Sequence, residues 1–167
     1  MALEGATFLT KHGRDKRGHW YFSLTREGEP LIQPYNIFSD CFASMAFGQL
    51  FRATGNQEHA DIAKNTFFNI IKRKEDPKGK YSKAYPGTRS LQSFALPMIL
   101  TNLVLEIENI VKPDLVDKTI EDGIDMVMNK FYRPELGVIL ESIDTNNNFS
   151  DSFEGRLVNP GHGLEAM

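Results

Sequence analysis

The sequence predicts an all-α fold built from pairs of antiparallel helices. Apolar residues recur at three- and four-residue spacing over several long segments, and glycine or proline stands at the ends of these segments. A helix followed by a partner helix occurs twice, which indicates a repeated unit. With 41% hydrophobic and 25% charged residues, the 167-residue chain can bury a core of single-domain size. Repeated helix pairs of this kind are often arranged as a closed toroid with the functional cavity on its axis.

The first predicted pair begins with a helix from about Tyr35 to Thr54, which Gly55 ends. Its partner begins near Gln57 and ends in the charged run before Pro77. The apolar residues at helical spacing are Phe38, Phe42, Met45, Ala46, Leu50 and Phe51 in the first helix, and Ala60, Ala63, Phe67, Ile70 and Ile71 in the second.

The second predicted pair starts with a mostly apolar helix from Phe94 to about Val111, with Pro97 in its first turn. Pro113 opens the partner helix, because proline is well tolerated at the first helical position. The apolar face of this partner consists of Val116, Ile120, Ile124, Val127 and Phe131.

A charged turn, a glycine and a short extended segment recur beside these helix pairs. The glycines are Gly18, Gly79 and Gly137, which recur about every 60 residues. We expect short β-hairpins on one rim of the helical fold, near residues 20–32 and 138–149.

Both ends of the sequence look like parts of helices. Residues 2–9 resemble the last turns of a helix, and residues 161–167 resemble the start of one. We therefore expect residues 1–167 to form a single partial domain of helix pairs. Helix pairs without neighbours expose apolar surface, so the sequence also predicts a homo-oligomer.

Charge and composition argue against several classes of partner. The net charge is −3, and the short basic run 72–74 is followed directly by Glu75 and Asp76, which makes nucleic acid an unexpected partner. No apolar stretch is long enough to cross a bilayer, and no signal peptide is apparent, so we expect a cytoplasmic protein that does not bind membranes. The single cysteine, Cys41, lies in an apolar run and is expected to be a buried, unreactive thiol.

His162 is the most suggestive candidate for chemistry. Asn159, Pro160 and Gly161 precede it at a predicted helix start, and Glu165 follows one turn later on the same face. A histidine with an acidic neighbour suits a general base. Spacing alone favours the plainer alternative, a helix-capping turn with an incidental histidine.

The other three histidines do not predict a metal site. His12, His19 and His59 show no metal-ligand spacing with one another or with Cys41, so no metal is expected. His59 falls in the polar beginning of a helix, where a solvated position is expected.

Two further patterns have plain structural interpretations. The segment 144–150 resembles the start of a calcium loop, but Phe149 and Gly155 occupy the places of the required glycine and glutamate, so a turn is expected. Aromatic residues cluster at 20–22 and around Tyr35, Phe38 and Phe42. They could line a sugar site, but aromatics at helical spacing more often belong to the core.

Several segments, taken in order, resemble the N-acylglucosamine 2-epimerase family, which includes the mammalian renin-binding protein and is related to the cellobiose 2-epimerases. The resemblance covers nearly all of the chain, and the segments occur in the order and at the spacing of the family. They are 20–28, 34–39, 45–50, 86–89, 95–98, 153–156 and 162–166.

The resemblance implies a fold and a reaction. The family fold is an (α/α)6 barrel, of which this chain would form a part. Members interconvert sugars epimeric at C2, such as N-acetylglucosamine and N-acetylmannosamine. The resemblance implies two histidines as an acid/base pair on opposite faces of C2 and no metal or redox cofactor. Some members are activated by ATP without consuming it, so ATP is a possible activator here.

The resemblance also implies particular site residues. His162 matches the histidine of the Pro-Gly-His motif, Glu165 matches its helical partner, and Arg156 matches the arginine six residues before that histidine. The further substrate-site candidates are Arg89, Met98 and Asn102. The second histidine and the first helices of the barrel have no counterpart in the 167 residues, so this chain is expected to be inactive alone. The alternative is a non-catalytic binding or assembly protein on the same helical scaffold.

Overall fold

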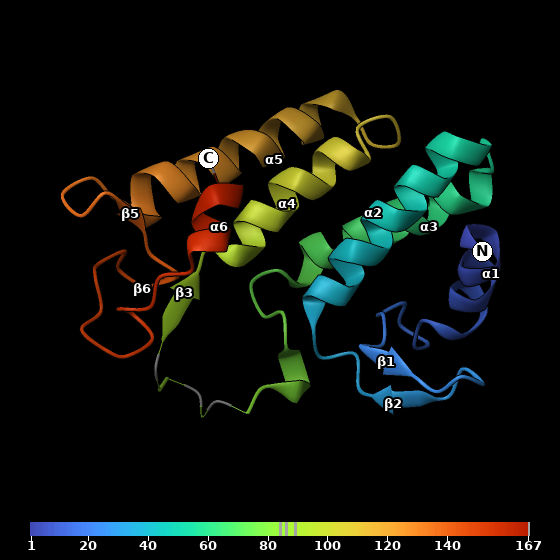
Figure 1. Cartoon of the computed structure of the whole chain (residues 1–167), viewed down its shortest axis with the longest axis horizontal. Coiled ribbons are helices and arrows are strands. Elements are labelled where there is room, and N and C mark those ends of the chain that lie inside the picture. The colour runs from blue at the N-terminus through green and yellow to red at the C-terminus, as the bar shows by residue number, and fades with distance from the viewer. Residues whose placement is uncertain (84, 86, 89, 167) are drawn as a thin grey trace. The chain divides into compact units, whose positions relative to one another are not determined.

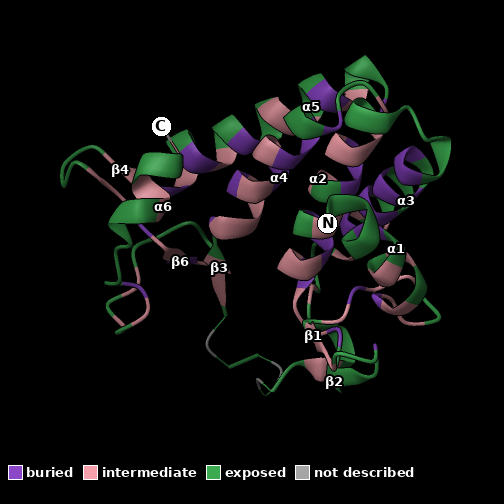
Figure 2. Cartoon of the chain, turned by 45° about the vertical axis from the view of Figure 1, so that its right-hand side comes forward, coloured by how far each residue is buried: buried purple, intermediate pink, exposed green. Residues whose placement is uncertain are grey.

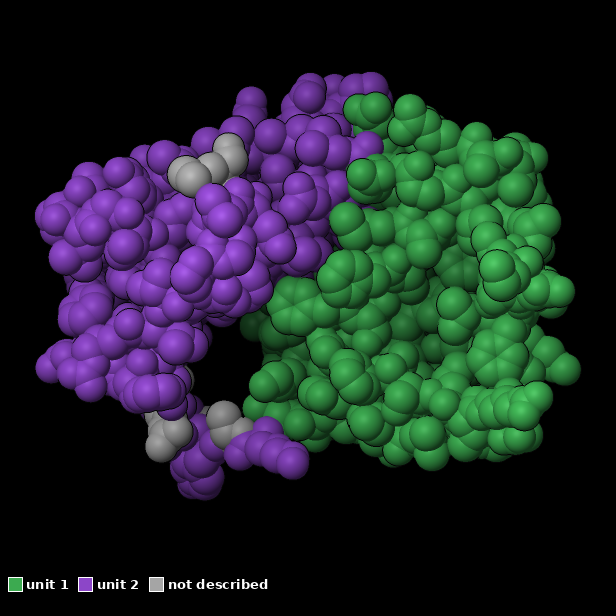
Figure 3. Space-filling model, viewed as in Figure 1, with its two compact units in different colours: residues 1–82, 106–111 green, residues 83–105, 112–167 purple. Residues whose placement is uncertain are grey.

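The computed structural model describes residues 1–166 with the exception of 84, 86 and 89 (Figure 1). Most of these residues are helical, and the strands are short antiparallel pairs, which confirms the predicted helical character. The chain divides into two compact units (Figure 3). Unit 1 contains Met1–Ser82 and Glu106–Val111, and unit 2 contains Lys83–Leu105 and Lys112–Met167.

Unit 1 is built around the first predicted helix pair. Helix α2 (Ile37–Thr54) packs against α3 (Gln57–Arg73), and both lie where the apolar spacing places them. The Asn36 side chain caps α2 by accepting a hydrogen bond from the Phe38 N–H. Gly55 ends α2 with a φ of 68°, a left-handed conformation that glycine adopts easily.

The remaining elements of unit 1 are short. Helix α1 (Ala2–His12) begins the chain, and the strands β1 (Ser23–Leu24) and β2 (Pro30–Ile32) form an antiparallel hairpin. This hairpin confirms the one predicted near residues 20–32. The segment around Gly79 forms a 3-10 helix, η1 (Gly79–Tyr81).

Buried residues of α2 and α3 form the core of unit 1 (Figure 2). Trp20 is also buried and contacts residues of both helices. The Trp20 indole N–H donates to Thr66 Oγ1 at 3.1 Å, and its ring lies 5.4 Å from that of Phe47. The expectation that the aromatic clusters are core holds for Trp20, which is 3% exposed. It is wrong for Phe42, which is 59% exposed on α2.

Cys41 and His59 test two further expectations. Cys41 is fully buried, and burial raises the pKa of its thiol to about 12, as expected for an unreactive cysteine. His59 is also buried, so its predicted solvated position is wrong. Its ring packs near Phe47, and its Nδ1 lies 3.2 Å from Thr54 Oγ1, so the last turn of α2 covers it.

Unit 2 contains the second predicted helix pair. Helix α4 (Ala95–Glu106) is followed by α5 (Pro113–Asp125), which continues into the π-helix η2 (Met126–Phe131). The two helices approach closely at Gly123, where an added Cβ would lie 3.4 Å from Thr101 Cβ. Helix α4 ends before the predicted Val111. Lys112 is extended because it precedes Pro113, and the residues from Ile107 onward form turns.

Unit 2 also contains two strand pairs and a short final helix. Strands β4 (Tyr132–Arg133) and β5 (Val138–Ile139) form a hairpin, with Gly137 at a φ of 65°. Strand β6 (Ser142–Asp144) pairs instead with β3 (Leu91–Ser93), and α6 (Pro160–Glu165) follows a series of turns.

The predicted hairpin within residues 138–149 is therefore wrong in its pairing. Its two strands exist, but each pairs with a different partner. Leu140 separates them, because its N–H donates to the Phe131 carbonyl and its side chain is buried. The Asp144 carboxylate accepts hydrogen bonds from the N–H groups of Asn146 and Asn148, which confirms the predicted turn there.

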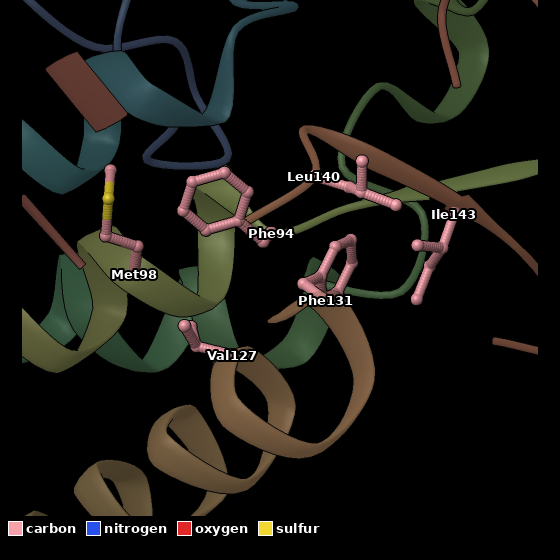
Figure 4. Packing of buried hydrophobic residues seen from close by; sticks show 6 residues of the cluster. All are labelled: Phe94, Met98, Val127, Phe131, Leu140 and Ile143. Carbon is pink, nitrogen blue, oxygen red and sulfur yellow. The ribbon is translucent and has the colours of Figure 1, made fainter. Parts of the chain in front are cut away.

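The core of unit 2 joins α4, η2 and the strand β6. It consists of Phe94, Met98, Val127, Phe131, Leu140 and Ile143 (Figure 4). Among the described residues of both units, no helix is long and apolar enough to span a bilayer.

Candidate active site

His162 lies in the first turn of α6, a position that the local sequence explains. Pro160 occupies the first turn, and the Asn159 side chain accepts a hydrogen bond from the Gly161 N–H at 3.1 Å. At the other end of the helix, Ala166 packs against the apolar core of unit 2. The short helix is thus capped at its start and packed against the core at its end.

Glu141 is the residue that contacts the His162 ring. His162 Nδ1 lies 3.0 Å from Glu141 Oε1 and 3.1 Å from Glu141 Oε2. The side chain of Glu141 is 12% exposed, whereas that of His162 is 35% exposed. One edge of the imidazole therefore faces a largely buried carboxylate, while part of the ring remains open to solvent.

The register of the β3–β6 ladder places Glu141 next to Phe94. Ser93 pairs with Ser142, so the next positions along the two antiparallel chains are Phe94 and Glu141. The Phe94 ring meets the His162 ring edge to face, with 6.0 Å between the ring centroids and an interplanar angle of 82°. Phe94 and Glu141 thus contact the imidazole from two neighbouring chain segments.

Contacts with the core of unit 2 hold Phe94 and Glu141 in position. Phe94 is fully buried, and its ring lies 5.8 Å from that of Phe131 (Figure 4). The Leu140 N–H donates to the Phe131 carbonyl at 3.1 Å, and the Glu141 N–H donates to the Leu157 carbonyl. The backbone on either side of the Glu141 carboxylate is therefore held by hydrogen bonds.

Glu165 lies on the same helix as His162, as its spacing predicted, but another carboxylate contacts the ring. It lies on α6 with His162 and is exposed. The carboxylate within hydrogen-bond distance of the His162 ring is that of Glu141. Glu165 therefore does not orient the ring in this structure, and its role as a substrate contact stays a prediction.

The other predicted site residues are those at positions 89, 98, 102 and 156. Met98 and Asn102 follow Phe94 at intervals of four residues, on the same face of α4. Met98 is buried in the core cluster, and Asn102 is half-buried. Arg156 is exposed, and its guanidinium lies 3.1 Å from Asp151 Oδ1. Arg89 lies outside the described residues.

Sequence reasoning missed Glu141 and Phe94. One local signal marks Glu141, because it is a carboxylate inside the mostly apolar extended run 138–143, where a buried charge requires a partner. The sequence does not indicate which histidine that partner is. Phe94 was expected only as the beginning of a helix, and its contact with His162 depends on the strand pairing.

A sequence model of N-acylglucosamine 2-epimerase (GlcNAc 2-epimerase) matches residues 1–167. The N-acylglucosamine 2-epimerase of Bos taurus is 32% identical over 148 residues, which are 87% of this chain and 35% of that protein. The N-acylglucosamine 2-epimerase of Homo sapiens is 31% identical over 170 residues, which are 99% of this chain and 40% of that protein.

A solved structure supports the fold. The crystal structure of a sugar epimerase from a ruminal bacterium matches 86% of this chain and 40% of its own, with a TM-score of 0.70 and 18% identity. This chain spans well under half the length of each of these relatives. The family match over all 167 residues, with relatives above 30% identity, shows that the chain belongs to the N-acylglucosamine 2-epimerase family, a family of sugar 2-epimerases.

Proposed function

We propose that this chain supplies one acid/base face of a carbohydrate 2-epimerase, with His162 as the group that exchanges a proton at C2 of the sugar. The observation that carries the proposal is the contact between His162 Nδ1 and the Glu141 carboxylate at 3.0 Å. It leaves the other ring nitrogen for a substrate, in a ring that is partly open to solvent. The family points to N-acetylglucosamine, N-acetylmannosamine or a related aldose as the substrate.

The chemistry requires a base and a means to stabilise negative charge. In the open-chain sugar, C2 lies next to the aldehyde, so removal of its proton gives an enediolate. A positioned imidazole can take that proton, because histidine side chains ordinarily titrate near neutral pH. Donors from Arg156 and Asn102 would stabilise the enediolate oxygen. This route needs neither a metal nor a redox cofactor, and ATP would act only as an activator that is not consumed.

Inversion at C2 requires a second group on the opposite face. The relatives are longer than this chain, and the matched part is about 35–40% of their length. We propose that the second acid/base group lies in the part that the 167 residues do not match. The helix pairs would then belong to a partial (α/α)6 barrel, and the fold likeness to a sugar epimerase supports this arrangement.

Deuterium exchange tests the role of His162 directly. N-acetylmannosamine is incubated with the 167-residue chain in deuterium oxide, and loss of the C2 proton signal is followed by NMR. We expect deuterium uptake without conversion to N-acetylglucosamine. His162→Asn should reduce uptake by roughly 10²–10⁴-fold, as expected for loss of a positioned acid/base group. His12→Asn, the same substitution in unit 1, serves as the matched control.

Three outcomes would overturn the proposal. The first is equal uptake by the wild type and His162→Asn. The second is no uptake above the buffer rate. The third is binding of the sugar without exchange, which would favour the non-catalytic alternative, a binding or assembly protein on the same scaffold.

A further inference from the structure

We propose that Glu141 is the positioning residue that keeps the hydrogen of neutral His162 on Nδ1, so that Nε2 is the nitrogen that exchanges protons with the substrate. The assignment of Nε2 to the sugar depends on the proposed function. The position of the hydrogen does not depend on it, because it is a property of the folded chain alone.

The hydrogen bond between Glu141 and His162 determines which ring nitrogen carries the hydrogen. Both carboxylate oxygens of Glu141 lie 3.0–3.1 Å from His162 Nδ1. An ionised carboxylate only accepts hydrogen bonds, so Nδ1 must be the donor. A neutral imidazole carries a single N–H, which leaves Nε2 with a free lone pair.

The surrounding fold holds both members of the pair in place. Glu141 is largely buried, and its backbone is held by Leu157 on one side and by the β3–β6 ladder on the other. The Phe94 ring stands against the imidazole at 82° and is itself fully buried. The imidazole is therefore held by a hydrogen bond to Glu141 and by packing against a buried aromatic ring, which favours its observed orientation.

The tautomer matters for catalysis, because it decides which ring nitrogen has a free lone pair. In free neutral histidine the form with hydrogen on Nε2 predominates, and that form places an N–H where the reaction needs a lone pair. Glu141 reverses this preference by accepting the Nδ1 hydrogen. Carboxylates that fix a catalytic imidazole in this way contribute up to about 10⁴-fold to the rate.

The tautomer can be measured without any substrate. The chain is labelled with ¹⁵N on histidine, and long-range ¹H–¹⁵N correlation NMR is recorded above the pH at which the rings titrate. Wild-type His162 should show a protonated Nδ1 and an unprotonated Nε2. Glu141→Met, which keeps an unbranched side chain without a carboxylate, should shift the ring toward the Nε2–H form.

Two further variants separate positioning from a merely structural role. Glu141→Gln keeps the size of the side chain but puts an NH2 donor beside Nδ1, so it should also shift the ring toward the Nε2–H form without leaving a gap in the packing. Glu135→Met removes an exposed carboxylate from the turn between β4 and β5, and should leave the tautomer unchanged. Helical content measured by circular dichroism shows that each variant is folded.

The outcomes are decisive in either direction. An Nε2–H form in the wild type, or an unchanged tautomer in folded Glu141→Met, would overturn the inference. If the tautomer changes as expected, deuterium uptake at C2 should fall by roughly 10²–10⁴-fold in Glu141→Met and in Glu141→Gln, and should stay at the wild-type level in Glu135→Met. A wild-type chain with the Nδ1–H form but no uptake would refute the proposed function and leave the assignment of the hydrogen intact.

Discussion

Asp40 is a fully buried carboxylate in α2, and its partners are few. Arg73 forms an ion pair with it, and the Trp20 N–H lies 3.4 Å from Oδ1. Burial raises the pKa of Asp40 to about 6, and these two partners offset only part of that effect. The residue is therefore a local source of pH dependence in unit 1.

The sign of this dependence follows from the two states of the chain. In the unfolded chain the pKa of an aspartate is about 3.9, so between about pH 4 and 6 the folded protein binds the proton more tightly. Asp40 therefore contributes most to the free energy of unfolding below about pH 4, and the contribution is lost as the pH rises through about 6. At about 1.4 kcal/mol per pKa unit, the loss is roughly 2–3 kcal/mol.

Urea unfolding of the wild type and Asp40→Asn at a series of pH values measures this contribution. The stability of the wild type relative to the variant should fall by roughly 2–3 kcal/mol between about pH 4 and pH 8. Asp61→Asn, at an exposed position of α3, is the control and should show no such trend. A constant difference between the wild type and Asp40→Asn would contradict the prediction.

At the scale of elements, two helical glycines differ in what surrounds them. Gly48 in α2 is buried, and an added Cβ would lie 2.6 Å from Cγ2 of the fully buried Ile107. Gly5 in α1 is exposed and has no heavy atom within 4 Å of an added Cβ. The same substitution should therefore have opposite effects in the two helices.

Gly48→Ala should lower the free energy of unfolding by about 1–3 kcal/mol, because overpacking outweighs the gain in helix propensity. Gly5→Ala should raise it by about 0.5–1 kcal/mol, because only the propensity changes. Both values are measured by denaturant unfolding. A Gly48→Ala variant at least as stable as the wild type would show that Ile107 can move aside.

The elements also show what local sequence can predict. Helices α2 and α3 were predicted almost to their ends. The signals for them, the apolar spacing and Gly55, depend only on residues close together in the sequence. The pairing of β3 with β6 was not predicted, because it joins segments far apart in the chain and neither short strand indicates its partner. The site follows the same division. His162 was proposed from its local motif together with the family resemblance, and Glu141 was missed because its contact depends on that pairing.

At the scale of the whole molecule, both units expose large apolar side chains. In unit 1, Leu31 is 63% and Phe42 is 59% exposed, and in unit 2, Phe153 is 74% and Leu164 is 70% exposed. Exposed apolar side chains in such number favour association between copies. The homo-oligomer therefore stays a prediction, and the exposed apolar side chains of each unit support it.

Light scattering over a range of protein concentrations tests this prediction. The mean mass should rise above the 18.9 kDa of one chain as the concentration increases. Phe42→Glu or Phe153→Glu should weaken the association, whereas Asn146→Glu adds the same charge at an exposed polar position and should not. A constant monomer mass without binding of an apolar dye would contradict it.

The β3–β6 ladder has a consequence for synthesis of the chain on the ribosome. Helices α2 and α3 are adjacent in sequence and can pack as soon as both have emerged. Phe94 must wait for Glu141, and both must wait for His162, because these residues follow it far along the chain. The growing chain therefore holds Phe94 without its final neighbours until residues 141 and 162 have been made, and a chaperone would have to shield this apolar segment during that interval.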